Sequence, residues 1–321
     1  MKFLKKLTLL LTLAVSVFAL TACSANTLAV NGYLWFNDPS VFNPNFVETS
    51  VYDVSFVNQT PSNSTKVEVE GYSLNVKSGV YTTVLKSFRN PQGLGDYYEY
   101  TTSFTLIADY VVPSPENGVY EVIEESFSTK TIFKSDLTPI TSEKSYQSSM
   151  SNYKYSYVIE YSGSTATASL RESTLEDKNV NEQTFTFKKY NKKAYIDNDI
   201  LLLAQRLFNI DGSFTRSFKT VDVLSNKLHK MNSYAYLRDK NLDVKDLENY
   251  VLNGVDLKAT EPTVSCAHVQ IAIADTFAGA PIECYYAQDR NTHRHRLIET
   301  YTTFGSLGYL KFHLSNVTVT E

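Results

Sequence analysis

The sequence predicts a mainly β protein, with a curled antiparallel sheet or incomplete barrel and one amphipathic helix. Aromatic residues are abundant, with 23 Tyr and 18 Phe in 321 residues, and such side chains suit the pleated, half-buried surface of strands. Apolar and polar residues also alternate with a period of two along most of the chain. This pattern is typical of strands with one packed face and one solvated face. A clear helical period occurs in one segment.

The alternating segments follow one another along the chain, separated by turn signals. The clearest runs from Tyr98 to Tyr110, between breaks at Asn90–Asp96 and Pro113–Gly118. Another runs from Tyr153 to Tyr161, and Ser162-Gly163 after it predicts a tight hairpin turn. From about residue 264 to 319, the pattern predicts a four-stranded meander with turns near 275–280, 289–293 and 304–308.

The helix is predicted to follow Asp197 or Asn198, either of which can cap its first turn. Apolar residues then recur at helical spacing from Ile200 to Phe208, and Asn209–Gly212 ends the segment. A weaker second helix is predicted over Asp243–Leu252. Residues 23–48 show no sustained period and are interpreted as the anchor and an irregular lead-in, so the β domain is expected to span residues 49–321.

Residues 1–22 have the features of a secretory signal peptide: a basic start, an apolar run over Leu7–Leu20 and a small residue at Ala22. The apolar run is shorter than the ~20 residues that a membrane-spanning helix needs. The stretch Leu20-Thr21-Ala22-Cys23 resembles the lipobox of bacterial lipoproteins. That resemblance implies cleavage after Ala22 and a diacylglyceryl group on Cys23, with fatty acyl chains such as palmitate. The protein is then expected outside the cytoplasm, bound through this lipid to the cell membrane or outer envelope.

The charge balance argues against binding to nucleic acid. The chain has a formal net charge of −4, and the leader removes lysines but no acidic residues. A net negative charge is the opposite of the basic electrostatic footprint that is usual for a nucleic-acid-binding protein. Nucleic acid is therefore not an expected partner. The candidate partners are the membrane, through a lipid at Cys23, and an apolar ligand or an envelope protein.

Three segments carry a resemblance to a known group of proteins: Thr131–Ile140, with its leucine–x–proline corner; Asp197–Ile200, leading into the helix; and the final meander. Together they resemble bacterial envelope proteins of unknown function whose fold is related to the Lol-type lipoprotein carriers. In these proteins an antiparallel sheet curls into an incomplete barrel around a helix. The resemblance covers about residues 50–319, but the tyrosine-rich segment near 97–130 has no counterpart in it. It implies no catalytic residues.

After Cys23, the remaining cysteines are Cys266 and Cys284. Outside the cytoplasm a disulfide is the default expectation for such a pair. However, a hairpin turn at Thr276–Gly279 would place Cys266 opposite residue 289, about 16 Å along the strand from Cys284, which is too far for a bridge. A turn centred on Asp275 would place the two cysteines opposite each other. The disulfide therefore depends on where this turn falls.

His293 and His295 are the strongest candidates for metal ligands. Residues i and i+2 of a strand share a face, so both imidazoles could reach one ion, with His313 on the neighbouring predicted strand as a third ligand. An exposed polar strand start next to a turn explains the same residues without a metal. We therefore expect neither a metal nor any other cofactor.

The functional prediction is a binding protein. The sequence contains no Gly-x-Ser-x-Gly or His-Glu-x-x-His motif, and no catalytic residue is assigned. We expect a non-enzymatic lipoprotein for ligand binding or envelope maintenance. An apolar or amphiphilic ligand would lie between the aromatic strand faces and the helix. Ordinary core packing explains the same stripes. The alternatives are a cell-envelope hydrolase with dispersed acidic or histidine residues and an adhesive surface protein. The candidate lining comprises Tyr98, Tyr100, Phe104, Tyr155, Tyr157, Leu203 and Leu207.

Overall fold

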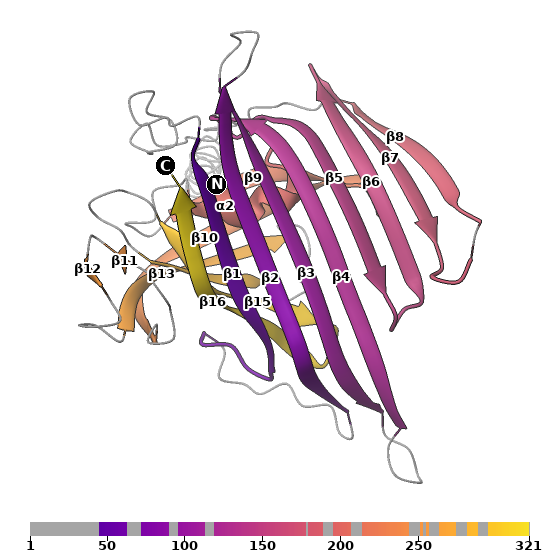
Figure 1. Cartoon of the computed structure of the whole chain (residues 1–321). Helices are drawn as coiled ribbons and strands as arrows, with labels where there is room; N and C mark the ends of the chain where they lie inside the picture. Colours follow the sequence, from indigo (N-terminus) through magenta and orange to yellow (C-terminus); the bar gives the residue numbers. More distant parts are fainter. Residues whose placement is uncertain are drawn as a thin grey trace, which may run out of the picture.

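The computed structural model is a nearly closed barrel formed by a 14-stranded antiparallel sheet, with one short helix among the described residues (Figure 1). This confirms the predicted fold class. The described residues are 45–62, 72–89, 96–112, 119–177, 179–188, 195–206, 214–243, 251–252, 255–256, 263–273, 281–287 and 295–320. The leader, Cys23 and the rest of residues 1–44 lie outside this set.

The first half of the chain is a meander of long strands, and the second half returns beside it. The strands of the first half are β1 (Val47–Val57), β2 (Ser73–Arg89), β3 (Asp96–Val112), β4 (Val119–Lys134), β5 (Pro139–Ser148), β6 (Tyr153–Ser162), β7 (Thr165–Ser173) and β8 (Asn181–Lys188). A single turn of 3₁₀ helix, η1 (Asn198–Ile200), continues directly into helix α2 (Leu201–Arg206). The later strands are β9 (Phe214–Asp222), β10 (Lys227–Asp243), β11 (Val251–Leu252), β12 (Val255–Asp256), β13 (Thr263–Ile273), β14 (Ile282–Ala287), β15 (Arg296–Phe304) and β16 (Gly308–Thr320).

The two ends of the described chain meet in the middle of the sheet. The strand order is β8-β7-β6-β5-β4-β3-β2-β1-β16-β15-β14-β13-β10-β9, and β11 with β12 forms a separate small hairpin. The first strand pairs antiparallel with the last, from Val47 opposite Thr320 to Val57 opposite Tyr309. The edges of the large sheet are therefore β8 and β9, and the barrel closes between them.

The barrel interior is packed by the aromatic and aliphatic residues that alternate along each strand. On β3, the even-numbered residues from Tyr98 to Ala108 are buried, while Ser103 and Thr105 are exposed. Rings from different strands stack in this core. For example, the ring centroids of Phe104 and Phe127 are 5.1 Å apart. The alternation seen in the sequence thus becomes an inner packed face and an outer polar face.

Two turns fall where the sequence predicts them. Gly163, between β6 and β7, has a φ of 56°, a conformation that glycine adopts without steric cost. The turn between β4 and β5 contains the leucine–x–proline corner, in which Leu137 has a φ of 65°. The Leu137 side chain is fully buried, and its backbone N–H donates to the carbonyl of Lys134 at 2.9 Å. Core packing thus holds a non-glycine residue in the left-handed region.

The helix lies on the concave side of the sheet, behind β1 and β2 in the view of Figure 1, and is held there by buried polar contacts. Arg206 donates two hydrogen bonds to the Glu48 carboxylate of β1, at 2.6 and 3.2 Å, and another to the carbonyl of His295 at 2.5 Å. Arg296 binds the same carboxylate at 2.8 Å. The hydroxyl of Tyr286 donates to the carbonyl of Leu202 at 2.9 Å. These contacts tie α2 to β1, β14 and β15.

The final meander is confirmed, since β13 to β16 occupy the predicted positions. The first helix is confirmed over η1 and α2, whereas Leu207 and Phe208 lie outside the described residues. The second predicted helix is wrong at both of its ends, because Asp243 closes β10 and Leu252 belongs to β11. The lead-in is shorter than expected, because β1 already begins at Val47. Within the described part of the chain, no helix has the length and apolar character needed to cross a membrane.

Candidate functional site

The barrel seam is closed by side-chain packing. Among the described residues, no strand pairing joins β8 to β9. Instead, Tyr195 forms an isolated parallel bridge with Lys219 of β9, and the N–H of Ile196 donates to the carbonyl of Lys219 at 3.0 Å. A second hydrophobic cluster fills the space between the two edges, separately from the main core. Its buried members are Tyr157, Ile159, Ala166, Ala168, Leu170, Phe187, Tyr195, Val221 and Val223.

A pocket of about 210 Å³ lies at this seam. One wall comes from the inward faces of β5 and β6, and the other from β9, β10 and the turn between them. The lining combines two aromatic rings, several aliphatic side chains and a few polar groups, which is the usual composition of a small-molecule site. The lining residues are Lys144, Tyr155, Tyr157, Asn198, Thr220, Val221, Asp222, Val223, Leu224, His229 and Met231.

The polar end of the pocket is organised by the capped start of the helix. Lys144 forms an ion pair with Asp199 at 2.9 Å, and the Tyr157 hydroxyl donates to the same carboxylate at 3.0 Å. Burial opposes the charge on Lys144, but Asp199 outweighs it and raises the pKa of the ammonium group. The positive charge of Lys144 is therefore compensated within the protein.

Asp197 caps the helix directly behind this pair. Its carboxylate accepts the backbone N–H of Asp199 at 2.9 Å and the hydroxyls of Tyr161 at 2.5 Å and Ser142 at 3.2 Å. Burial and the neighbouring Asp199 carboxylate raise the pKa of Asp197 to about 6. The sequence predicts the cap but gives no sign of the strand hydroxyls that meet it.

Thr220 is the unusual group in the lining. It is only 3% exposed, and among the described residues its hydroxyl has no hydrogen-bond partner. Thr220 pairs with His229 across β9 and β10, and it lies two residues from the core residue Phe218 on the same face of β9, so its side chain faces the barrel interior. Buried hydroxyls in proteins are normally satisfied, because leaving one unpaired costs about 1–3 kcal/mol. A hydroxyl in this condition is therefore suited to bind a ligand.

Asp222, Ser225 and His229 cluster at the rim of the pocket but do not form a catalytic triad. Ser225 donates to the Asp222 carboxylate at 2.6 Å, and both groups approach the same ring nitrogen, Nε2 of His229, at 3.2 and 3.0 Å. In a triad the serine and the carboxylate bind opposite nitrogens of the ring. Although partial burial favours the neutral acid, the hydrogen bonds from Ser225 and His229 lower the pKa of Asp222. The cluster stabilises the β9–β10 turn.

The predicted ligand-lining residues separate into two groups. Tyr155 and Tyr157 line the seam pocket. Tyr98, Tyr100, Phe104 and Leu203 are buried in the main core, and Leu207 lies outside the described residues. The residues missed by sequence reasoning, such as Thr220 and Lys144, come from strands far apart in the chain. No local pattern could bring them together.

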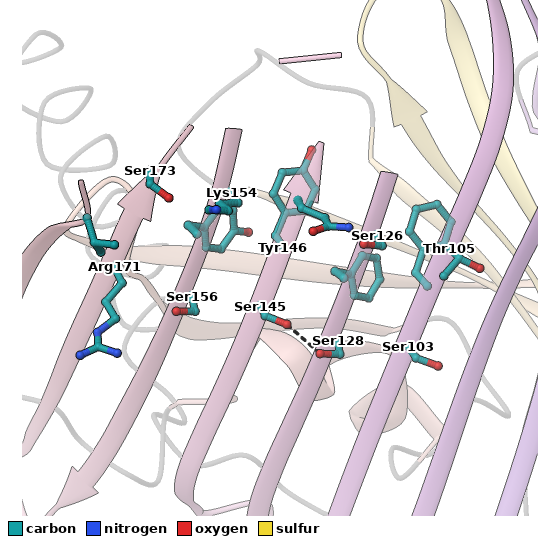
Figure 2. A pocket seen from close by; sticks show the side chains of 15 residues that line it. Ser103, Thr105, Ser126, Ser128, Ser145, Tyr146, Lys154, Ser156, Arg171 and Ser173 are labelled. Atoms are coloured by element: carbon teal, nitrogen blue, oxygen red, sulfur yellow. Dashed lines mark hydrogen bonds between the residues drawn. The ribbon is translucent and has the colours of Figure 1, made fainter. Parts of the chain in front are cut away.

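A larger, open groove of about 570 Å³ lies on the outer face of β3 to β7 (Figure 2). A row of serines crosses the strands there, pairing Ser103 with Ser128, Ser128 with Ser145, and Ser145 with Ser156. The hydroxyls of Ser128 and Ser145 are 2.8 Å apart, as the dashed line in Figure 2 shows. This groove offers mostly small exposed hydroxyls and, unlike the seam pocket, no described buried polar group without a partner.

The proposed metal ligands do not come together. His293 lies outside the described residues. His295 contacts the carbonyl of Arg206 inside the barrel, with its Nδ1 at 3.4 Å. His313 alternates with the core residues Phe312 and Leu314, so it faces outward, and it contacts Glu299 at 2.9 Å. Within the described residues, no group of three or more His, Cys, Asp and Glu side chains is arranged to hold a metal.

Cys266 and Cys284 are both buried and are not bridged to each other. They lie on neighbouring strands, but Cys266 is opposite Ala287 and Cys284 is opposite Val269. An offset of three residues separates them by about 10 Å along the strand and places their side chains on opposite faces of the sheet. The possible disulfide between them is therefore not formed, because the register of β13 and β14 places Cys266 opposite Ala287.

Buried carboxylates on the outer face of β14 and β15 bear on the hydrolase alternative. Glu283 accepts hydrogen bonds from Thr60, Ser62 and Tyr285. Glu299 accepts the Tyr301 hydroxyl at 2.6 Å and is paired with Lys311 at 2.7 Å and with His313.

Burial favours the neutral form of Glu299, but these partners outweigh it and lower its pKa to about 2. A general acid for glycoside hydrolysis needs the opposite shift. Glu299 is therefore suited to hold the strands together and not to donate a proton.

The sequence matches no protein-family model and no curated protein. The structure, however, is similar to the crystal structure of a beta-barrel-like protein of domain of unknown function DUF1849 from Brucella abortus. The match has a TM-score of 0.50 and 9% sequence identity, and it covers 86% of this chain and 99% of that chain. What the two share is the barrel-like fold. The resemblance seen in the sequence is thereby supported at the level of architecture.

Proposed function

We propose that the protein is an extracytoplasmic lipoprotein, anchored through Cys23, that binds a small amphiphilic ligand in the seam pocket without catalysing a reaction. The buried hydroxyl of Thr220, which has no hydrogen-bond partner among the described residues and faces a pocket lined by Tyr155 and Tyr157, carries this proposal. The barrel-like fold is compatible with such a role, since ligand sites commonly lie in the mouths of β-barrels.

The charges of the pocket define the polar end of the ligand. Lys144 is neutralised by Asp199, and Asp222 accepts hydrogen bonds from Ser225 and His229. A ligand with a full charge would find no uncompensated partner among these groups, whereas a neutral hydroxyl or carbonyl could bind Thr220. The volume, about 210 Å³, is below the ~300–1,000 Å³ of drug-sized sites. We therefore propose a ligand with a small uncharged polar head and an apolar portion.

Native mass spectrometry and equilibrium titration of the lipid-free chain, residues 24–321, test the proposal. A neutral short-chain monoacylglycerol, small enough for the pocket, should bind more tightly than a fatty acid of the same chain length. Leu224→Trp should weaken binding at least tenfold, because Leu224 lines the pocket yet is 47% exposed and can be enlarged without repacking the core. The matched control is Val158→Trp on β6, where Val158 is 43% exposed and outside the pocket lining.

Thr220→Val tests the polar contact itself. Removing a hydroxyl that the ligand satisfies should weaken binding about fivefold, the loss of roughly one hydrogen bond. The same change should stabilise the free protein, because an unpaired buried hydroxyl is removed. If no monoacylglycerol or fatty acid binds, or if Leu224→Trp and Val158→Trp have equal effects, the proposal is wrong.

A further inference from the structure

We propose that β8 is a self-association edge, at which two copies of the chain pair antiparallel through β8 and join their sheets. This inference goes beyond ligand binding and is independent of it. It rests on the exposure of β8, on its position at the edge of the sheet and on a complementarity within its own sequence.

β8 is an edge strand of the sheet, and most of its side chains are exposed to solvent. Among the described residues it pairs with β7 alone, and six of its eight residues are exposed. Figure 1 shows it at the far edge of the sheet, on the side away from β1. An edge strand presents unpaired backbone N–H and C=O groups, which form a template for a further strand. Unlike β8, the other sheet edge, β9, is bridged by Tyr195.

The sequence of β8, Asn-Glu-Gln-Thr-Phe-Thr-Phe-Lys, is complementary to itself in one antiparallel register. If Phe185 lies at the two-fold axis, opposite its own copy, then Glu182 falls opposite Lys188 of the second chain. Because the axis makes every contact reciprocal, this ion pair occurs twice. Thr184 falls opposite Thr186 in the same register. Opposite-charge, Thr–Thr and aromatic–aromatic cross-strand pairs are all stabilising in antiparallel sheets.

Glu182 and Lys188 also lie on the same face of β8. Glu182 lies beside Arg171 of β7 with an N–O distance of 3.0 Å, on the outer face, and Lys188 shares this face because it lies an even number of residues away. Both Arg171 and Glu182 are more than 60% exposed. Glu182 can therefore accept Lys188 of a second chain while it keeps Arg171. A shift of register by two residues would lose both ion pairs. The charges therefore favour a second copy of β8 as the partner strand, in the register that places Phe185 at the two-fold axis.

Cross-linking of the full chain in the membranes of expressing cells tests the pairing. With Phe185→Cys, two chains should form a disulfide-linked dimer, since directly opposed Cβ atoms lie about 4.5–5.5 Å apart. Val158→Cys, on an exposed site of β6, is the control and should give background dimer only. The native cysteines Cys266 and Cys284 are buried and do not compete.

Charge reversal then tests the register. In the Phe185→Cys background, Glu182→Lys or Lys188→Glu alone should reduce the dimer at least fivefold, because like charges then face each other twice. The combined Glu182→Lys/Lys188→Glu variant should return it to within twofold. Glu160→Lys, an equal charge change at an exposed site on β6, should have no effect. The same four charge variants, made with Phe185 intact, should follow the same order in the mass of the detergent-solubilised full chain measured by light scattering.

Three results would each overturn the proposal. The first is that the Phe185→Cys variant gives no more dimer than the Val158→Cys variant. The second is that the combined Glu182→Lys/Lys188→Glu variant does not restore the amount of dimer. The third is a disulfide between the Phe185→Cys variant and a different protein in place of a second copy of the chain.

Discussion

The Glu48 carboxylate is expected to contribute a large share of the stability of the barrel. It lies on β1 and is 3% exposed, and it receives Arg206 from the helix and Arg296 from β15. Burial favours the neutral acid, but the two arginines outweigh it and lower the pKa of Glu48 from 4.5 to about 2. Because each pH unit corresponds to about 1.4 kcal/mol, the ionised carboxylate contributes about 3 kcal/mol to the free energy of unfolding.

The sign of the pH dependence follows from the lowered pKa. The contribution of Glu48 is fully present above pH 4.5, the ordinary pKa of this group, and is lost as the pH falls towards 2. Glu48→Gln keeps the shape of the side chain but leaves two buried guanidinium groups without a counter-charge. At pH 7 we expect the free energy of unfolding to fall by about 3–5 kcal/mol, the usual result of breaking a buried pair.

Urea unfolding followed by circular dichroism and tyrosine fluorescence measures this change. The variant should also lose the part of the pH dependence between 4.5 and 2 that comes from Glu48. Glu160→Gln, the same change at an exposed site, should alter stability by less than about 0.5 kcal/mol. If Glu48→Gln were as stable as Glu160→Gln at pH 7, the ion pairs would not hold the helix in the barrel and the reasoning would be refuted.

Three further predictions concern single groups. Burial and the neighbouring Asp199 raise the pKa of Asp197 from 3.8 to about 6, so the folded protein favours the neutral acid and this group contributes more stability as the pH falls from 6 to 3.8. Asp197→Asn should remove this part of the pH dependence, and an unchanged pH profile would contradict the assignment. Cys266 and Cys284 should resist alkylation in the native protein, since both are buried and the pKa of the Cys284 thiol is raised to about 12. Both thiols should react after unfolding without a reductant. A disulfide between them would block that reaction and contradict the prediction. Cys23→Ala should release the protein from the membrane fraction with its β domain folded, and retention in that fraction would count against the lipid anchor.

The fold can be predicted largely because period-two alternation is a local signal. Tyr98 to Tyr110 shows it in full, and the structure buries the predicted face. The centre of a turn is a weaker signal. The pairing of the two cysteines depends on the centre of one hairpin, and a shift of one or two residues there decides whether Cys266 faces Cys284. The apolar residues of Asp243–Leu252 have helical spacing, but Asp243 is the last residue of β10 and Leu252 belongs to β11.

The candidate site is harder to predict than the fold, because it arises from contacts between distant segments. Tyr155 and Tyr157 can be identified from their aromatic stripe. Thr220 has no distinguishing local sequence, and its importance depends on being buried opposite β6. The stripe on β3 is equally aromatic, yet Tyr98 and Phe104 are core residues because the barrel curls over them. Strand alternation gives the face of a residue but not what covers that face.

Photo-cross-linking with a neutral monoacylglycerol that carries a photoreactive group on its acyl chain tests the central claim most directly. Peptide mapping of the cross-linked chain identifies the segments that contact the ligand. We predict adducts on β6 and on the β9–β10 hairpin, the two walls of the seam pocket, and their loss on competition with unlabelled monoacylglycerol. Adducts confined to the outer serine groove, or labelling that does not saturate, would contradict the account.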